Sequence, residues 1–486
     1  MVGSGVAGLA VAARLAAAGH EVTVFEKNEF PGGKLSEIRS GDFRFDAGPS
    51  LFTMPKWLDE VFETAEKNPR DYFECVRLDV LCNYYWQSGK SLRFYADLDL
   101  TSKAMVTRFG ERENALREYL LRSEKKYQSA GEIFLKKPMN ALSTWSNMKV
   151  VKALFKLPRY DMFKTLHQVN QGHFKSPEMV QLFNRYATYN GSDPFRTSGM
   201  FSMIPHIEMN LGAYAPKGGM IEITHSLVRL GKDLGIQYRF SSEVAKITTR
   251  SDSCTGIELT SGEKISFDRV VSNMDVNLTY SKLLPGISSP KKLNFEERSS
   301  SGFIFYWGMN KTFPELDVHN IFFSSDYREE FKAIQSGRIA DDFTVYVNIS
   351  SKYHSADAPE GMENWFVMVN VPEDTGQDWT ECREFLKDQI LKRLESDLGT
   401  SVGDHIITEE VLDPQMLSKR TMSADGALYG SSSNNKWAAF LRQFNRHSKV
   451  RNLYFCGGSV HPGGGIPLCL SSAEIVADII KGEENK

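Results

Sequence analysis

Residues 2–26 read VGSGVAGLAVAARLAAAGHEVTVFE, and this stretch decides the fold. It opens with Gly3-Ser4-Gly5-Val6-Ala7-Gly8, a GxGxxG spacing, and Glu26 follows at about the 20-residue offset of a dinucleotide-binding βαβ unit. The small and apolar residues 6–18 predict a buried helix that Gly19 ends, and residues 21–26 predict a strand. The sequence therefore predicts an α/β chain that starts with a nucleotide-binding domain.

The glycines and Glu26 have separate roles in such a unit. Gly3 permits the tight turn, Gly5 lets backbone amides approach a pyrophosphate, and Gly8 allows the helix to pack closely on the strand. The phosphates then lie at the helix N-terminus, where unpaired N–H groups and the helix dipole favour anions. The Glu26 carboxylate suits two ribose hydroxyls and would repel a 2′-phosphate. An adenosine with a free ribose is implied.

The first strand is short. Only Met1 and Val2 precede Gly3, whereas a buried parallel strand usually has about five residues. We therefore expect the natural chain to begin a few residues upstream, which the intact mass of the purified protein checks.

Composition excludes several classes of protein. A chain of 486 residues holds two or three domains, and its net charge of −3 does not match binding to a phosphate backbone, so no nucleic-acid partner is expected. Six cysteines without CxxC spacing indicate neither a disulfide scaffold nor a metal site and fit a reducing, cytoplasmic setting. The apolar run at residues 6–18 is too short to span a membrane. Any membrane contact is therefore expected to be peripheral.

Beyond the first unit, the pattern predicts two strand-rich blocks and several helices. Short strands at 237–240, 243–249, 256–260 and 269–272 predict one β-meander attached to the nucleotide-binding domain. A second block, at 302–309, 343–349 and 364–371, predicts a separate sheet on the substrate side. Helices are expected from the turn at 216–220 to Leu234, and over 379–398 with one apolar face.

Residues 114–174 are helical in pattern and locally basic. No acidic residue lies between Glu132 and Asp161, while basic residues accumulate among large apolar ones. The basic residues are Lys136, Lys137, Lys149, Lys152, Lys156 and Arg159. Such a segment lies in a lipid headgroup layer or forms the solvated face of an ordinary core helix, and the pattern favours neither.

A second glycine-rich cluster stands near the C-terminus, at residues 457–467. Two further turns, at residues 32–34 and 46–50, are poor in large side chains and suit close approach by a ligand, although ordinary turns have the same composition. We expect the two ends of the chain to meet on one cofactor.

These motifs together resemble the bacterial phytoene-desaturase-type carotenoid desaturases. The resemblance rests on the N-terminal block and on residues 45–50, 216–220, 272–275 and 458–467, and it is weak over about 101–195. Such enzymes are flavoproteins of the amine-oxidase superfamily, so the resemblance implies FAD rather than NAD. It also implies a Rossmann-type FAD-binding domain interleaved with a substrate domain that contains a mostly antiparallel sheet, and a helical region associated with the membrane.

The resemblance implies boundaries for these parts and a set of cofactor contacts. The FAD-binding domain would comprise residues 1–85, 215–290 and 445–486, the substrate domain 86–105, 186–214 and 291–444, and the helical region 106–185. The expected FAD contacts are Gly3, Gly5, Val6, Ala7, Gly8, Glu26, Lys27, Gly33, Lys34, Gly48, Pro49, Ser50, Val244, Gly458, Gly465, Ile466 and Pro467. Lys34 stands where the superfamily often has arginine, and it would meet a phosphate as a point charge without arginine's planar fork.

Residues 426–432 with 437–440 are similar to the branch that desaturates 1-hydroxycarotenoids at the 3,4 position, for example 1′-hydroxy-γ-carotene. In such a reaction one hydrogen leaves as hydride to the flavin and the other as a proton. The candidate proton acceptors are Tyr186, Tyr189, His206 and Glu208, and we favour Glu208 or His206, although packing roles are common for such residues. His461 is expected to shape the flavin-facing turn.

Other functions fit the same glycines. A phytoene desaturase, an amine or porphyrinogen oxidase, or a carotenoid isomerase or saturase would use this scaffold on another substrate, and a non-redox carrier of isoprenoid lipids would use it without a flavin. We expect a peripheral protein that draws a carotenoid from the inner face of the cell membrane. Oxygen and a quinone are both candidates for reoxidising the flavin.

Overall fold

The N-terminal βαβ unit forms as the glycine spacing predicts. In the computed structural model, which describes residues 1–137, 160–294, 296–435 and 442–485, helix α1 spans Val6–Ala17 and strand β1 spans Thr23–Phe25. Val2 lies between β1 and the later strand β13 (Val270–Ser272) through parallel bridges to Phe25 and Ser272. The extreme N-terminus is therefore a central member of a parallel sheet.

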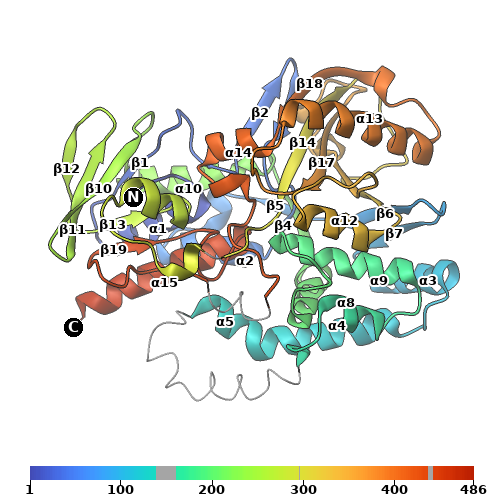
Figure 1. Ribbon diagram of the computed structural model, residues 1–486, viewed down its shortest axis with the longest axis horizontal. Coiled ribbons are helices and arrows are strands. Elements are labelled where there is room, and N and C mark those ends of the chain that lie inside the picture. The colour runs from blue at the N-terminus through green and yellow to red at the C-terminus, as the bar shows by residue number, and fades with distance from the viewer. Residues whose placement is uncertain (138–159, 295, 436–441, 486) are drawn as a thin grey trace.

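This parallel sheet is assembled from distant parts of the chain. Strand β9 (Gln237–Arg239) pairs with β1, and β19 (Leu453–Phe455) pairs with β13, both in parallel. On one face, α1 packs with α2 (Pro55–Thr64), α10 (Ile221–Asp233) and α15 (Ile466–Glu484). The other face packs on an antiparallel sheet of β10 (Val244–Arg250), β11 (Ser253–Leu259) and β12 (Lys264–Ser266). Figure 1 shows these layers at the N-terminal end of the molecule.

The predicted β-meander was wrong in its pairing. Its four strands do not form one sheet, because β9 and β13 join the parallel sheet and β12, which the prediction missed, completes the antiparallel one. All three residues of β13 are buried, as expected for a parallel strand covered on both faces. Strand β12 escaped notice because it has three residues, of which only Ile265 is apolar.

A seven-stranded sheet forms the core of the other half of the molecule, as Figure 1 shows. Its neighbours pair antiparallel except β15 with β6, which confirms the predicted mostly antiparallel sheet. The order is β18 (Ile406–Leu412), β14 (Ser301–Met309), β17 (Glu363–Val371), β16 (Val345–Asn348), β15 (His319–Phe323), β6 (Val80–Trp86) and β7 (Ser91–Tyr95). The expected boundary at residue 85 falls inside β6, so we propose to move it to about residue 79.

The helix predicted over residues 379–398 is α13 (Trp379–Leu398), which covers this sheet. The Asp378 side chain caps it by accepting hydrogen bonds from the backbone N–H groups of Thr380 and Glu381, and Gly399 ends it at a φ of 65°. Leu386, Ile390 and Leu394 are buried. The 3.6-residue apolar period therefore predicted the helix and most of its packed face, whereas Phe385, expected on that face, is exposed.

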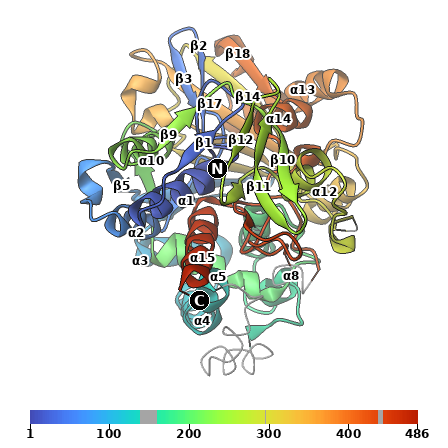
Figure 2. The same cartoon turned by 90° about the vertical axis from the view of Figure 1, so that its left-hand side faces the viewer.

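Shorter strands and a helical region complete the fold. The shorter elements are the hairpin β2 (Glu37–Ser40) and β3 (Phe43–Asp46), the small sheet β4 (Phe52–Thr53), β8 (Ala213–Pro216) and β5 (Cys75–Arg77), and helices α11 (Val276–Leu278), α12 (Tyr327–Gln335) and α14 (Pro414–Thr421). The helical region holds α3 (Leu98–Phe109), α4 (Ala115–Lys126), α5 (Glu132–Lys136), α8 (Leu166–Gln171) and α9 (Pro177–Asn184). In this region α5 packs on the first half of α15, where Lys136 lies 3.5 Å from Glu474, and Figure 2 shows the same region from the side.

The basic stretch of the sequence lies mainly outside the described residues. Lys149, Lys152, Lys156 and Arg159 all belong to residues 138–159. Within the ranges that the structure describes, no helix has both the length and the apolar composition needed to cross a membrane.

Candidate functional site

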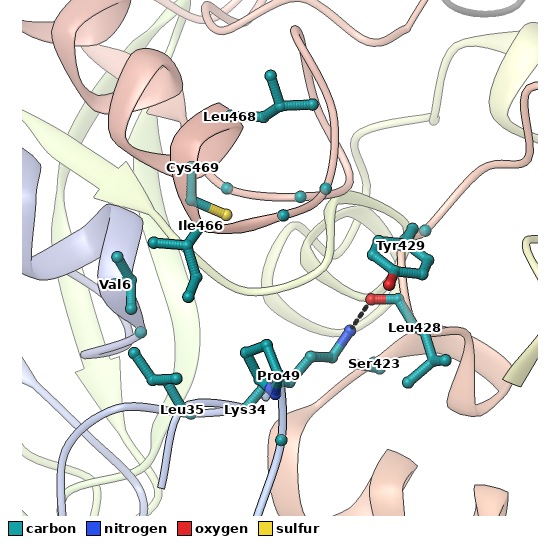
Figure 3. A pocket seen from close by; sticks show the side chains of 18 of the residues that line it. Val6, Lys34, Leu35, Pro49, Ser423, Leu428, Tyr429, Ile466, Leu468 and Cys469 are labelled. Atoms are coloured by element: carbon teal, nitrogen blue, oxygen red, sulfur yellow. Dashed lines mark hydrogen bonds between the residues drawn. The ribbon is translucent and has the colours of Figure 1, made fainter. Parts of the chain in front are cut away.

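The two glycine-rich ends of the chain line one cavity of about 740 Å³. Figure 3 shows Val6 and Leu35 from the N-terminal segments facing Ile466 and Cys469 at the start of α15. Asn273 joins the two ends, because its Nδ2 donates to the carbonyl oxygen of Cys456 at 3.1 Å while it packs against Gly5. The expected meeting of both ends at one site is therefore present.

The N-terminal glycines leave room for a diphosphate. Gly3 has a φ of 88°, which side chains disfavour, and a Cβ on Gly5 would lie 2.6 Å from the Asn273 side-chain oxygen. Among the described residues, no side chain caps α1, so its first N–H groups stay available at the cavity. Gly8 does not line the cavity. A Cβ there would lie 2.5 Å from the Gly3 carbonyl oxygen, so Gly8 serves the close packing of helix on turn.

Glu26 directly follows β1 and is buried at the cavity wall. Its Oε2 accepts hydrogen bonds from the Ser4 backbone N–H at 2.9 Å and the Ser4 hydroxyl at 2.8 Å, and its Oε1 accepts from the Asn28 N–H at 3.0 Å. A carboxylate offers about four acceptor positions, so one position on Oε1 stays open for a ribose hydroxyl. The negative charge makes this end unsuited to a 2′-phosphate.

Lys34 has partners other than the expected phosphate. Figure 3 shows its ammonium group reaching the loop at Leu428, where Nζ donates to the carbonyl oxygens of Leu428 at 2.6 Å and Ala427 at 3.1 Å. Burial lowers the pKa of Lys34 to about 8. Lys34 thus ties the N-terminal glycine pair to the 426–432 loop, and its phosphate contact stays a prediction.

The turn at residues 46–50 is fixed on both sides. Asp46 accepts hydrogen bonds from the backbone N–H groups of Met220 at 2.9 Å and Ile221 at 3.3 Å, which anchors the start of α10. A Cβ on Gly48 would lie 1.9 Å from the Lys34 carbonyl oxygen, so another residue would displace the turn. Ser50 shares a hydrogen bond of 2.7 Å with the Tyr346 hydroxyl, which connects the turn to the seven-stranded sheet.

Arg442 organises the C-terminal turn, and sequence reasoning missed it. The buried guanidinium donates from Nη1 to the carbonyl oxygens of Tyr429 at 3.1 Å and Gly458 at 3.2 Å, and from Nη2 to that of Ser431 at 2.7 Å. A lone arginine in a loop gave no pattern that could have identified Arg442.

Gly465 lies directly before α15 with a φ of 108°, and a Cβ there would meet nothing within 4 Å.

His461 is held within the turn, as expected for a shaping role. Its Nε2 lies 3.0 Å from the Lys137 carbonyl oxygen and donates to it, and its backbone N–H donates to the Gln443 carbonyl oxygen at 2.9 Å. The Nδ1 is buried and has no hydrogen-bond partner among the described residues. Burial lowers the pKa of His461 to about 4, so the ring is neutral at pH 7.

We expect His461→Gln to reduce the acid sensitivity of the protein. Because the folded pKa is about 4 and the unfolded pKa about 6.5, the histidine's contribution to stability is complete above pH 6.5 and is lost as pH falls towards 4. Between pH 7 and pH 5 this loss is about 2 kcal/mol, and the glutamine variant should lack it. Urea unfolding of both proteins at the two pH values measures the difference. Equal losses in both proteins would contradict this account.

Past these segments the cavity enters an apolar space between the seven-stranded sheet and the short helical turns of residues 199–210. The sheet side is lined by Leu81, Ile304, Ile321, Phe366 and Met368, and the opposite side by Met200, Met203, Ile204 and Ile207, together with Phe134 of α5. A cavity of this kind suits a long apolar molecule whose end reaches the C-terminal turn.

Glu208 is the ionisable centre of a polar cluster in this wall. It lies in the π-helical turn His206–Asn210, where Oε1 accepts a hydrogen bond from Tyr186 at 3.0 Å and Oε2 accepts one from Tyr189. Arg185 lies 3.5 Å from Oε1 and donates to Tyr189 at 3.1 Å and to Tyr84 at 2.8 Å. Glu208, Tyr189 and Arg185 line the cavity.

His206 does not share this position. Its Nδ1 lies 2.8 Å from the Asn210 side-chain nitrogen, its ring packs on Tyr127 at 5.2 Å between centroids, and the described cavity lining does not include it. The structure therefore gives His206 no path to a molecule in the cavity. Of the two favoured candidates, Glu208 alone meets this requirement.

Comparison with known proteins agrees with the geometry. A model of the family described as flavin containing amine oxidoreductase matches residues 6–481. The chain belongs to this family. It is a flavin-dependent oxidoreductase, and the prediction of FAD is confirmed.

Two relatives and one solved structure illustrate what the chain is similar to. The chain is 46% identical over 481 residues to a 1-hydroxycarotenoid 3,4-desaturase from Flavobacterium sp. (strain P99-3), with 99% of this chain and 98% of the relative covered. It is 30% identical over 507 residues to a phytoene desaturase from Fusarium fujikuroi, with 99% and 88% covered. A solved structure of wild-type putrescine oxidase bound to putrescine matches with a TM-score of 0.65 at 13% identity, covering 99% of this chain and 98% of that one. This last likeness shows the fold alone.

The residues predicted to contact FAD gather at this site. Except for Gly8, each of them lines the cavity: Gly3, Gly5, Val6, Ala7, Glu26, Lys27, Gly33, Lys34, Gly48, Pro49, Ser50, Val244, Gly458, Gly465, Ile466 and Pro467. The open N–H groups of α1, the free acceptor position on Glu26 and the side-chain-free surface at Gly465 fit a diphosphate, a ribose and a flat ring. Their individual contacts with FAD stay predictions.

Proposed function

We propose that the chain desaturates a carotenoid by removing two hydrogens from adjacent carbons, and that its substrate is a 1-hydroxycarotenoid desaturated at the 3,4 position. The observation that carries this proposal is the continuity of the cavity, which runs from the FAD segments into a long apolar space with one polar cluster in its wall. The 46% identity to a protein of that activity supports the choice of substrate. A small amine would leave most of this apolar wall without contacts.

When bound, FAD supplies the acceptor for a hydride, that is, for two electrons and one of the two hydrogens. The chain's own residues then have three tasks. The apolar walls hold the polyene and exclude water, the turn at residues 46–50 and the C-terminal turn position the reacting carbons, and one group takes the remaining proton. The carbon–carbon double bond forms as both hydrogens leave.

We assign the proton to Glu208 with Tyr189. Tyr189 lines the cavity, and its hydroxyl donates a hydrogen bond to Glu208 Oε2. When the tyrosine oxygen accepts the substrate proton, the hydroxyl's own proton can move along this bond to the carboxylate. Arg185 stabilises the carboxylate before the transfer. No further side chain has to move in this route.

We further propose that the protein takes its substrate from the inner face of the cell membrane. The apolar part of the cavity includes Gly131, Phe134 and Leu135, which immediately precede the basic and apolar sequence that continues to Arg159. Lysines interspersed with large apolar residues suit a surface of anionic lipid. This membrane contact would place the cavity beside its source of carotenoid.

Liposomes test both parts of the proposal. The purified protein is mixed with liposomes that carry a 1-hydroxycarotenoid, made either of neutral lipid or with anionic lipid added. We expect a product lighter by two hydrogens, and more protein sedimenting with the anionic liposomes. Phytoene liposomes run in parallel. Desaturation of phytoene with the hydroxycarotenoid left unchanged would favour a phytoene desaturase instead, and equal sedimentation would contradict the membrane contact.

A further inference from the structure

His319 lines the cavity and offers it a hydrogen-bond donor. His319 begins β15 and lines the cavity together with Ile321, two residues further along the same face of the strand. The side chain is 5% exposed. The same cavity is lined by the apolar Leu81, Ile304 and Phe366 and by the polar Tyr346. A polar group buried in this wall needs a hydrogen-bond partner for each of its ring nitrogens.

The hydrogen bonds of the ring determine which nitrogen carries the proton. Asn348 Nδ2 donates to the Val318 carbonyl oxygen at 2.9 Å, which fixes the orientation of its amide, and lies 3.2 Å from His319 Nδ1. The Tyr346 hydroxyl lies 2.7 Å from the same Nδ1. Because an amide nitrogen can only donate, Nδ1 is the acceptor from Asn348, and the Tyr346 hydroxyl shares the same lone pair; in a neutral ring the hydrogen is then on Nε2. Burial lowers the pKa of His319 to about 4, which keeps the ring neutral.

Nε2 is left without a partner in the protein. Over the described part of the chain, no hydrogen bond of His319 involves this atom. The atom is also not fully enclosed by the protein, so it retains some accessible surface. Since the side chain itself is buried against the cavity, the accessible side of Nε2 is the cavity. An N–H that points into an apolar space loses its hydration unless a ligand accepts from it.

The neighbouring polar cluster is not a competing site for a ligand hydroxyl. Tyr189 donates to Glu208, and the two terminal nitrogens of Arg185 donate to tyrosine hydroxyls. The second terminal nitrogen, Nη2, also lies 3.5 Å from Glu208 Oε1, and Nε is buried away from the cavity. Each of these nitrogens is therefore bonded within the protein or buried, whereas Nε2 of His319 is accessible and has no partner among the described residues.

We propose that His319 Nε2 donates a hydrogen bond to the hydroxyl on C1 of the substrate and thereby sets the preference for hydroxylated carotenoids. This inference rests on the proposed function. The turn that holds Ser50, a predicted FAD contact, connects to His319 through Tyr346, so the proposal places the ring near the reacting carbons. In a 3,4-desaturation, C3 is two carbon–carbon bonds from C1. The hydroxyl must therefore be recognised close to the reacting bond, as this position allows.

The test compares two substrates and two variants. His319→Phe keeps a ring without a donor, and His319→Gln restores an N–H near the position of Nε2. Each holoenzyme is assayed with a 1-hydroxycarotenoid and with the same carbon skeleton lacking the hydroxyl, and the affinity for each is measured from the absorption shift of the bound carotenoid. Flavin content checks that the variants fold.

We expect the wild type to prefer the hydroxylated substrate, and His319→Phe to lower kcat/KM for that substrate on the order of 100-fold while the deoxy substrate is little affected. His319→Gln should regain part of the preference. An unchanged ratio of the two substrates in His319→Phe would overturn the inference. If the wild type converts neither carotenoid, the proposed function fails. The ratio of the affinities for the hydroxylated and the deoxy carotenoid then tests His319 by itself. A preference for the hydroxylated carotenoid that is lost in His319→Phe supports the role of His319, and a preference that is retained overturns it.

Discussion

The Gly5→Val protein is expected to fold and to bind FAD on the order of 100-fold more weakly than the wild type. Gly5 has an ordinary φ of −64°, so valine adds no backbone strain. Its Cβ would lie 2.6 Å from the Asn273 side-chain oxygen, and its methyl groups would cover the N–H groups of α1. Overpacking and lost amide contacts together cost roughly 3 kcal/mol, which corresponds to about that loss of affinity.

Flavin content after purification and titration of the apoprotein with FAD measure this effect. Gly482→Ala is the matched control, because Gly482 lies in α15 with nothing within 4 Å of an added Cβ. The control should bind FAD as the wild type does. A Gly5→Val protein that retains full flavin at normal affinity would show that the diphosphate does not lie at this turn.

The second large effect is expected at Glu208. Glu208→Gln keeps the size of the side chain but removes the charge that accepts the proton, and the rate of flavin reduction by substrate should fall on the order of 100-fold or more. The same change leaves Arg185 as a buried cation without its carboxylate, which destabilises the protein by about 3–5 kcal/mol. Stopped-flow reduction of the flavin under anaerobic conditions separates the chemical step from the loss of stability.

A double variant distinguishes the catalytic role from the structural one. Arg185→Met with Glu208→Gln removes both charges, so much of the lost stability should return while flavin reduction stays slow. The pair of thermal unfolding and reduction-rate measurements is decisive. If the double variant regains nearly the wild-type rate, Glu208 is a structural partner of Arg185 and the proton goes elsewhere.

The local rules of chain geometry predicted the FAD end well. Few other residues permit the conformations and contacts found at the N-terminal glycines, at Glu26 and at the C-terminal glycines. For this reason the sequence pattern alone predicts that these residues lie at the cavity. The apolar period of α13 was equally clear. In each case the signal is contained in a short stretch of the chain, and the structure adds the partner that completes it.

Long-range pairing was predicted less well. Strands β9 and β13 are three residues each, too short for their pattern to show that β9 pairs with β1 and β13 with β19. Arg442 bonds to three carbonyl oxygens of loops adjacent in space but separate in sequence. Such contacts depend on the assembled fold, which a local pattern does not describe.

The same reason explains the outcome for the catalytic candidates. His206 and Glu208 are two residues apart in one turn, and the sequence gave no basis for choosing between them. The structure turns Glu208 towards the cavity and packs His206 on Tyr127. His319 attracted no attention, because it lies outside the predicted strands and a single histidine gains meaning only when the cavity wall around it is known.

Anaerobic single turnover tests the central claim most directly. The purified, flavin-loaded protein is mixed without oxygen with a 1-hydroxycarotenoid in liposomes, and the absorbance of oxidised flavin and the carotenoid spectrum are followed together. The account predicts that oxidised flavin bleaches as one equivalent of carotenoid lengthens its conjugation by one double bond and loses two hydrogens. Oxidised flavin that persists while the carotenoid stays unchanged would contradict it.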